Sequence, residues 1–366
     1  RGALWLSFQI SCCAALNKGT SRHTLMLSKA WSMQHLPGLQ LLHGGNVIMK
    51  RILITGASGY IGRKLTAFFS DKHEVGLVVG LDVKDPGFSG NKFVFYDRDV
   101  RQPLDDIINK HSIDTVIHAA FILPPIHDRE LMEDININGT RSVLDSCARA
   151  GVKRVLYTSS TTAYGFHPDN DRPLTEESPL RGNEDVTYSK SKRIIEGIFV
   201  DYGRLYPDIC FIVVRPCFVV GPGFDNPLAR FLRLKIVPIP ARTEPMQFIH
   251  EDDLVGIMWI LLQMGKGGAY NAAGDGVMTI REMASALGNR TLPLPYPLVY
   301  ALNNIAWLLR LTFLSEFPSP YLAMIRHSWA ASCEKLKRAT GYSFRYDTRQ
   351  AFDDFARHVA SLRNRD

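Results

Sequence analysis

From residue 51 onward, short hydrophobic runs alternate with longer stretches in which apolar residues recur at helical spacing. Short continuous apolar runs are typical of strands buried on both faces of a sheet, and the intervening stretches are typical of amphipathic helices. We expect strands at 51–55, 75–81, 93–96, 114–118, 154–159 and 209–214, and helices at roughly 60–70, 103–111, 129–150 and 186–205. This alternation predicts an α/β fold with a doubly wound parallel sheet and right-handed crossover connections.

The first predicted strand runs into a turn in which Gly56, Gly59 and Gly62 occupy every third position. A strand, a tight glycine turn and a helix N-terminus form a binding site for a dinucleotide pyrophosphate. The glycines let the backbone approach the phosphates, and the free N–H groups attract their negative charge. The same spacing also occurs in ordinary strand-to-helix turns, so the glycines alone do not decide the function. Further candidate cofactor-binding residues in this turn are Ser58, Tyr60 and Ile61.

The second predicted strand ends at Asp82, twenty residues after Gly62. A carboxylate at this position accepts hydrogen bonds from the adenosine ribose hydroxyls and repels a 2′-phosphate. Asp82 therefore favours NAD over NADP, although Lys84 lies close enough in the sequence to weaken that preference. The alternative is an exposed aspartate at a strand end that binds no ligand.

Tyr188 and Lys192 stand four residues apart in the helix predicted at 186–205, which places them on one helix face. A lysine ammonium beside a phenol lowers the phenol pKa from about 10, so the phenol can exchange protons near neutral pH. Ser160 follows the strand predicted at 154–159, at the edge where open α/β sheets bind ligands. These three residues are candidate catalytic groups; the alternatives are a surface helix pair and a turn hydroxyl.

Together these motifs resemble the extended short-chain dehydrogenase/reductase family, also called the NAD-dependent epimerase/dehydratase family. The resemblance runs from Met49 to the C-terminus and includes further motifs in the order typical of the family. These motifs are Asp99-Val100, Asp114-Thr-Val-Ile-His-Ala-Ala120, Asn136-Ile-Asn-Gly-Thr140, Arg215-Pro216, Gly221-Pro222 and Phe248-Ile-His-Glu-Asp-Asp-Leu254.

The resemblance implies a Rossmann fold with NAD as cofactor and no metal. It implies that Ser160 is the catalytic hydroxyl, Tyr188 the proton-transfer tyrosine and Lys192 its supporting lysine. The cofactor-binding residues that it adds are Asp99, Val100, Ala119, Ala120, Asn136, Tyr188, Lys192 and Pro216.

The resemblance also implies a domain division. Residues 49–222 would form the NAD-binding Rossmann domain. After residue 222 the pattern becomes irregular and rich in proline, so 223–366 would mainly form a smaller C-terminal substrate-binding lobe. Within this part, residues 248–262 would return to the Rossmann domain.

Two positions depart from the nucleotide-sugar branch of the family. That branch usually reads R-x-x-N-x-x-G-P after the sixth strand, whereas Phe218 stands here in place of the Asn. It also tends to carry Asn-Pro just before the catalytic tyrosine, which residues 183–187 lack. Both departures favour the branch that contains 3β-hydroxysteroid dehydrogenases and dihydroflavonol reductases. The candidate substrate contacts are Phe121, Thr161 and Phe218.

We therefore expect an NAD-dependent oxidoreductase that acts on a secondary alcohol or ketone of moderate polarity through Ser160, Tyr188 and Lys192. Two alternatives remain open. One is a sugar or nucleotide-sugar epimerase that retains tightly bound NAD, and the other is a non-catalytic NAD-binding protein.

Charge is distributed unevenly between the start of the chain and the remainder. Residues 1–48 contain four basic and no acidic residues, so the formal charge of +7 falls to +3 for the rest. This is not the concentrated basic surface of a nucleic-acid binder, and we expect a small-molecule substrate as partner. We expect residues 1–48 to be an N-terminal extension outside the fold and the protein to be cytoplasmic. If the extension is a transit peptide, the location is mitochondrial.

Residues 292–325 contain a strongly apolar helix candidate interrupted by Asn303, Asn304 and Arg310. A membrane-spanning helix needs ~20 apolar residues without charges, so we expect a buried or pocket-lining helix. A peripheral membrane contact is the alternative, because amphipathic helices of this kind lie at lipid interfaces. A homodimer is usual in the family, but no residue of this sequence identifies its interface.

Overall fold

The computed structural model describes residues 51–312 and 314–363. These described residues all belong to one compact unit. The predictions for residues 1–48 lie outside the described residues, and the division of the chain at residue 222 stays a prediction.

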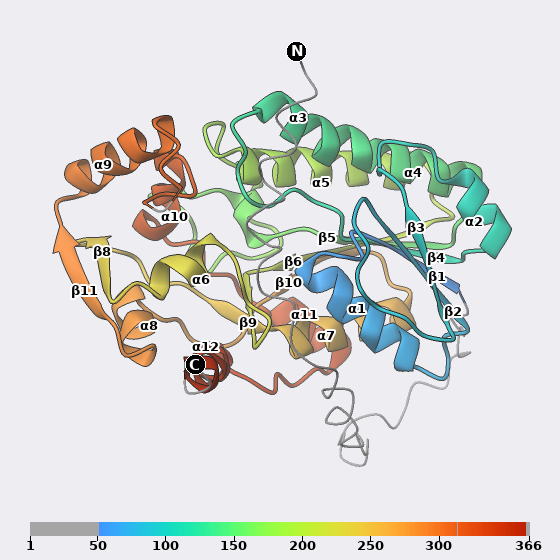
Figure 1. Cartoon of the computed structure of the whole chain (residues 1–366). Helices are drawn as coiled ribbons and strands as arrows, with labels where there is room; N and C mark the ends of the chain where they lie inside the picture. Colours follow the sequence, from blue (N-terminus) through green and yellow to red (C-terminus); the bar gives the residue numbers. More distant parts are fainter. Residues whose placement is uncertain (1–50, 313, 364–366) are drawn as a thin grey trace, which may run out of the picture. The chain divides into compact units, whose positions relative to one another are not determined.

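A seven-stranded parallel sheet occupies the centre of this unit (Figure 1). Its strand order is β10-β6-β5-β4-β1-β2-β3, so the order reverses between β1 and β4 and leaves a crevice at the carboxyl ends of the strands. The predicted doubly wound sheet is confirmed. The strands are β1 (Arg51–Thr55), β2 (Leu77–Asp82), β3 (Phe93–Asp97), β4 (Thr115–His118), β5 (Arg154–Thr158), β6 (Cys210–Pro216) and β10 (Gly268–Ala272).

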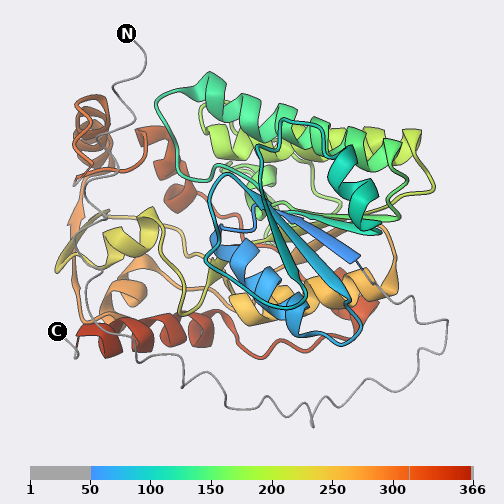
Figure 2. The same cartoon turned by 45° about the vertical axis from the view of Figure 1, so that its right-hand side comes forward.

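Helices cover both faces of the sheet (Figures 1 and 2). One face carries α1 (Tyr60–Asp71), α7 (Glu251–Met264) and α11 (Glu334–Thr340), and the other carries α2 (Asp105–His111), α4 (Gly139–Arg149) and α5 (Thr187–Leu205). The helix predicted at 129–150 is divided into α3 (Arg129–Glu133), the π-helical turn η1 (Asp134–Asn138) and α4. A π-turn inside a helix is often found at functional sites.

The central strands are largely apolar because both of their faces are buried. Ile52 and Ile54 of β1 pack on the side of α1 and α7, whereas Leu53 between them packs on the side of α4 and α5. The same alternation holds in β2, where Val78 and Val79 face opposite helix layers. Successive side chains of a strand point to opposite faces, so two helix layers require a continuous apolar run.

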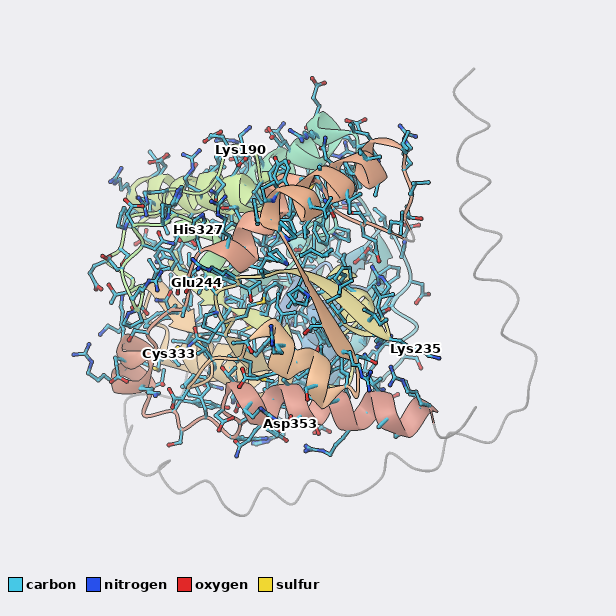
Figure 3. The ribbon with its side chains drawn as sticks, turned by 90° about the vertical axis from the view of Figure 1, so that its left-hand side faces the viewer. Lys190, Lys235, Glu244, His327, Cys333 and Asp353 are labelled. Atoms are coloured by element: carbon cyan, nitrogen blue, oxygen red, sulfur yellow. The ribbon has the colours of Figure 1, made fainter. Side chains whose placement is uncertain are left out.

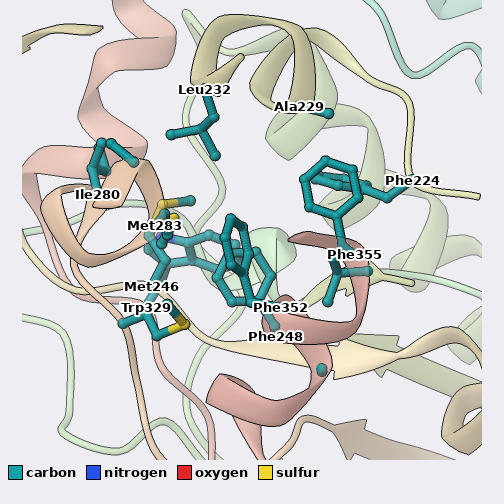
Figure 4. Close-up of a cluster of buried hydrophobic side chains, with 14 of the residues drawn as sticks. Phe224, Ala229, Leu232, Met246, Phe248, Ile280, Met283, Trp329, Phe352 and Phe355 are labelled. Atoms are coloured by element: carbon teal, nitrogen blue, oxygen red, sulfur yellow. The ribbon is translucent and has the colours of Figure 1, made fainter. Parts of the chain in front are cut away.

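The C-terminal part of the chain builds a separate hydrophobic cluster rich in aromatic rings (Figure 4). Phe248, Phe352 and Phe355 pack together at its centre. Two short parallel sheets flank it, β7 (Phe218–Val220) with β9 (Phe248–His250) and β8 (Ile236–Pro240) with β11 (Arg290–Leu294). The other elements of this region are α6 (Pro227–Leu232), α8 (Ile280–Ala286), α9 (Tyr296–Leu308), η3 (Ser319–Leu322), α10 (Ala323–Arg326) and α12 (Thr348–Arg363).

The expectation of a buried helix within 292–325 is wrong for α9. Leu302 and Ile305 are each more than half exposed, and Ala306 is the one residue of the helix that is fully buried. The helix packs one side against the rest of the unit, and no element of residues 51–312 or 314–363 forms a second layer over the other side. Within the described residues, no helix combines the length and apolar character needed to cross a bilayer.

The glycine turn depends on a contact that no other residue type permits. A Cβ added to Gly62 would lie 1.9 Å from the carbonyl oxygen of Gly56, so the first turn of α1 packs directly on the backbone that follows β1. Gly197 offers the contrast, because it lies in the interior of α5 with nothing within 4 Å of an added Cβ.

We expect Gly62→Ala to lower the free energy of unfolding by about 2–3 kcal/mol, because the methyl group has to displace backbone. Gly197→Ala is the matched control and should raise it by about 0.5–1 kcal/mol through better helix propensity. Urea unfolding of both variants measures the difference. Equal stability of the two variants would contradict the close approach at Gly62.

Candidate active site

The glycine turn lies at the crevice between β1 and β4. Gly56 has φ +72, and its N–H donates to the Leu81 carbonyl at 2.8 Å. A Cβ on Gly56 would lie 2.6 Å from the backbone of Ala120, and one on Gly59 would lie 3.3 Å from the Gly56 carbonyl. The turn is therefore a backbone cradle without room for side chains, as a bound pyrophosphate requires.

Asp82 is held at the rim of this turn. Its Oδ2 accepts the Ser58 N–H at 3.0 Å, and its Oδ1 accepts the Lys84 N–H at 3.3 Å. The Ser58 hydroxyl donates to the Lys84 carbonyl. The carboxylate remains partly exposed, so the structure brings Asp82 and the glycine turn together as the sequence predicts.

Tyr60 points towards a charged cluster. Its hydroxyl donates to the Glu251 carboxylate, which also pairs with Lys64 at 2.8 Å. Burial and the neighbouring carboxylate of Glu251 raise the pKa of Tyr60. The spacing of residues in the sequence does not identify Lys64 or Glu251, because they meet only when α7 packs against α1. Ile61 is half-buried against the core.

The predicted adenine contacts lie farther along the sheet edge. Asp99 forms a salt bridge with Arg101 at 2.6 Å, and the hydrogen bonds from Arg101 lower the pKa of Asp99. Val100 is buried against Gly139 at the start of α4.

Asn136 is buried in the π-helical turn. Its Oδ1 accepts the Ile122 N–H at 2.8 Å, and its Nδ2 donates to the Ile122 carbonyl at 3.3 Å. These contacts fix the segment after β4 that carries Ala119 and Ala120. Ala119 and Ala120 donate their N–H groups to the carbonyl and the hydroxyl of Thr55, which anchors this segment beside β1.

The predicted catalytic residues meet at the carboxyl end of β5. Ser160 is buried and its Oγ accepts the Thr162 N–H at 3.2 Å, at the start of a 3₁₀ turn. Tyr188 is the second residue of α5. Its ring meets the Phe121 ring edge-on, with centroids 5.2 Å apart.

Lys192 is buried one helical turn after Tyr188. Its Nζ donates to the Thr158 carbonyl at 2.8 Å and to the Tyr157 hydroxyl at 3.1 Å, and it lies 3.9 Å from the Phe121 ring centroid. Burial lowers the pKa of Lys192 to about 7. Tyr157, which the sequence pattern does not identify, is thus the side-chain acceptor for this ammonium.

The expectation that Lys192 lowers the pKa of Tyr188 is wrong in this structure. Burial raises the pKa of Tyr188, and the interaction with Ser160 lowers it by less. The Lys192 Nζ lies 5.7 Å from the Tyr188 ring centroid and directs its hydrogen bonds at Tyr157 and Thr158 instead. Tyr188 is therefore a neutral phenol at neutral pH.

A buried ion pair lies next to the candidate catalytic residues. Arg215 pairs with Glu196 at 2.7 Å, and the Ser159 hydroxyl donates to Glu196 at 2.6 Å. Glu196 stands four residues after Lys192 on α5 and raises the pKa of that lysine, although burial lowers it by more. Glu196 could have been identified from the sequence, because it lies on the same face of α5 as Tyr188 and Lys192. Its pairing with Arg215 on β6 could not, because the two residues are far apart in the sequence.

The candidate substrate contacts occupy different surroundings. Phe121 lies beside Tyr188 and Lys192, so it belongs to the same group. Thr161 is fully buried, and its hydroxyl donates to the Pro216 carbonyl at 3.4 Å, which orients it into the core. Phe218 packs against Trp329 and Phe248, with ring centroids 5.3 and 6.0 Å apart.

One contact to Tyr188 comes from the distant C-terminal part. The Tyr188 N–H donates to the Tyr321 hydroxyl at 3.3 Å. Tyr321 is buried in η3, the turn that follows α9 in the fold. The sequence provides no signal for this pairing.

Comparison with known proteins places the chain among enzymes of one family. The model of the NAD-dependent epimerase/dehydratase family matches residues 52–273. An uncharacterized protein of Mycobacterium tuberculosis is 28% identical over 317 residues, which cover 84% of each chain. The sterol-4-alpha-carboxylate 3-dehydrogenase (decarboxylating) of Saccharomyces cerevisiae is 27% identical over 194 residues, 50% of this chain and 54% of the yeast protein.

Solved structures show the same fold at lower identity. The UDP-glucose 4-epimerase of Thermotoga maritima, solved with UDP-glucose, has a TM-score of 0.69 at 17% identity and covers 85% of this chain and 99% of that chain. The dTDP-glucose 4,6-dehydratase of Bacillus anthracis, solved with NAD, has a TM-score of 0.67 at 18% identity and covers 86% and 98%. The family model spans more than half of this sequence and begins at the strand before the glycine turn. The chain therefore belongs to the NAD-dependent epimerase/dehydratase family.

Proposed function

We propose that this chain is an NAD-dependent oxidoreductase that transfers a hydride between nicotinamide and a secondary alcohol or ketone of moderate polarity. The observation that carries the proposal is the meeting of Ser160, Tyr188, Lys192 and Phe121 at the carboxyl end of β5. The glycine turn lies at the carboxyl end of β1 in the same sheet, so both groups face the edge where such sheets bind ligands.

The residues at the glycine turn fit a dinucleotide. Gly56 and Gly62 let the turn pack directly on neighbouring backbone, and Asp82 presents a partly exposed carboxylate beside it. These residues would hold the pyrophosphate and the adenosine ribose. When bound, NAD supplies the hydride chemistry, and the protein supplies orientation and electrostatics.

Tyr188 would act as the general acid in ketone reduction. Its raised pKa keeps the proton on the phenol at neutral pH, ready for transfer to a carbonyl oxygen. The Ser160 hydroxyl beside it would donate a hydrogen bond to the same oxygen and stabilise its developing charge. Lys192, buried one helical turn away, would contact the nicotinamide ribose, which is the other role predicted for it.

A substrate of moderate polarity suits the aromatic surroundings of this group. Phe121 lies against Tyr188, and the half-buried Phe218 belongs to a cluster with Trp329 and Phe248. The yeast relative is named as a sterol-4-alpha-carboxylate 3-dehydrogenase, which supports a substrate less polar than a nucleotide sugar. The epimerase and dehydratase structures are only 17 and 18% identical to this chain, so they indicate its fold and not its substrate.

The first test combines released cofactor with turnover. The full chain is denatured to identify the bound nucleotide, and NADH formation is followed with sterols, aryl alcohols and UDP-sugars. NADH from an apolar alcohol is the expected result, and its formation should be ~10²- to 10⁴-fold slower in Tyr188→Phe, because the variant lacks the oxygen that accepts the alcohol proton in this direction. UDP-sugar interconversion without net NADH would establish an epimerase instead, and bound NAD without turnover of any substrate would indicate a non-catalytic protein.

Asp82→Ala should weaken NAD binding about 10- to 100-fold, because a charged acceptor to the ribose hydroxyls is lost. NADP binding should weaken less or improve, since the carboxylate no longer repels the 2′-phosphate. Isothermal titration with both nucleotides measures the ratio. Asp85→Ala, another exposed carboxylate close to the turn in sequence, is the matched control. An unchanged NAD/NADP ratio in Asp82→Ala contradicts the assignment.

Lys192 makes stability depend on pH in a defined direction. Its folded pKa of about 7 lies below the ordinary value, so above pH 7 the unfolded chain binds a proton there that the folded chain does not. The free energy of unfolding should therefore rise relative to Lys192→Met by about 1.4 kcal/mol per pH unit between pH 7 and about 10. Below pH 7 the cost of burying the ammonium is fully present and the difference levels off. Parallel pH profiles of the two proteins would disprove this.

A further inference from the structure

Helix α9 carries a face of exposed apolar side chains, here called the α9 face. Leu298, Leu302, Ile305 and Leu309 follow one another at spacings of three and four residues and are 45, 53, 52 and 64% exposed. Residues at this spacing lie on one side of a helix. Further exposed apolar side chains in and beside the helix are Leu292, Tyr300, Leu308 and Leu314.

Such a face is unusual for a surface helix, which normally turns charged residues outward. Figure 3 looks onto the side of the structure that carries α9, β8 and β11. A contiguous apolar surface with this many leucines marks a contact site rather than scattered surface residues. Within the described residues, no segment covers these side chains.

The opposite side of α9 is fixed to the protein. The Asn303 amide donates to the Phe317 carbonyl at 3.0 Å and to the Ser319 hydroxyl at 3.1 Å. The Trp307 ring stacks on His127 with centroids 4.2 Å apart. The helix is therefore held in place by its polar and aromatic side, and the leucines face outward.

In the chain segment around α9, residues 283–326, every charge is positive except that of Glu316, which is paired. The helix itself has no charged residue, and no acidic residue occurs between Glu282 and Glu316. Arg310 follows its C-terminal end, and the Arg326 guanidinium lies 4.5 Å from the ring centroid of Tyr296 at its N-terminal end. Glu316 is occupied by a salt bridge with Arg230 at 2.5 Å.

We propose that the α9 face binds the surface of an anionic lipid membrane. The leucines would enter the boundary between headgroups and acyl chains, where helices with an apolar face lie in the interface plane. Arg310 and Arg326 would contact acidic headgroups. A second copy of the chain suits the face less well. A symmetric pair would bring the same arginines together, and residues 283–315 supply no carboxylate for them.

Flotation of the full chain with lipid vesicles tests the proposal. Vesicles of phosphatidylcholine and phosphatidylserine in equal parts should carry the protein to the top of a density gradient. Vesicles of phosphatidylcholine alone should carry at most ~one tenth as much, and added salt should reduce the anionic binding. Absence of flotation with the anionic vesicles would overturn the proposal.

Paired variants locate the contact on α9. Leu302→Gln with Ile305→Gln should reduce flotation at least ~tenfold, because less apolar surface enters the lipid. The matched control, Val200→Gln with Leu205→Gln, changes two side chains of α5 that are 54 and 68% exposed and should leave flotation unchanged. Equal flotation of both pairs would overturn the assignment to α9.

A charge variant keeps the test independent of the leucines. Arg310→Glu should weaken binding to anionic vesicles several-fold, whereas Arg204→Glu on α5 should not. Light scattering of the same protein samples measures whether the chain is a monomer or a dimer. A dimer that dissociates in the Leu302→Gln/Ile305→Gln variant and does not float would assign the face to a second copy and overturn the membrane contact.

Discussion

The contact between Gly62 and the Gly56 carbonyl is the constraint on which the rest of the site depends. It lets the N-terminus of α1 lie directly on the turn after β1, where a Cβ at position 62 would be 1.9 Å from that oxygen. The same turn touches Ala120 after β4 and hydrogen-bonds Leu81 at the end of β2. The ends of β1, β2 and β4 therefore meet around the glycine turn. The carboxylate of Asp82 is held there by the N–H of Ser58, which belongs to this turn.

A second constraint acts on the charge of Lys192. An ammonium buried this deeply loses hydration, and its pKa falls to about 7 because the carbonyl and hydroxyl that it contacts replace that hydration only in part. Glu196 opposes the shift but is shared with Arg215 and Ser159, so it cannot neutralise the lysine alone. Buried charges of both signs thus leave one group whose protonation changes near neutral pH, which is the property that proton transfer requires.

The sequence contained enough information for the sheet, the glycine turn and the adjacency of Tyr188 to Lys192, because each follows from local spacing. It could not predict the raised pKa of Tyr188, since the tyrosine is buried by segments that reach it only through the tertiary fold, such as those that carry Phe121 and Tyr321. Asn136 was predicted to touch the cofactor, and its bonds to Ile122 arise from a π-helical turn that periodicity does not indicate. The exposure of α9 was missed for a similar reason: an all-apolar pattern does not say whether a second layer will cover the helix.

The α9 helix and the proposed chemistry share a physical link. Asn303 of α9 bonds to Ser319 at the start of η3, and Tyr321 in the same turn accepts the Tyr188 N–H. Trp307 of α9 stacks on His127, in the segment that also carries Phe121. Two of the chain segments that touch Tyr188 from outside α5 are therefore packed against the helix whose outer face is apolar.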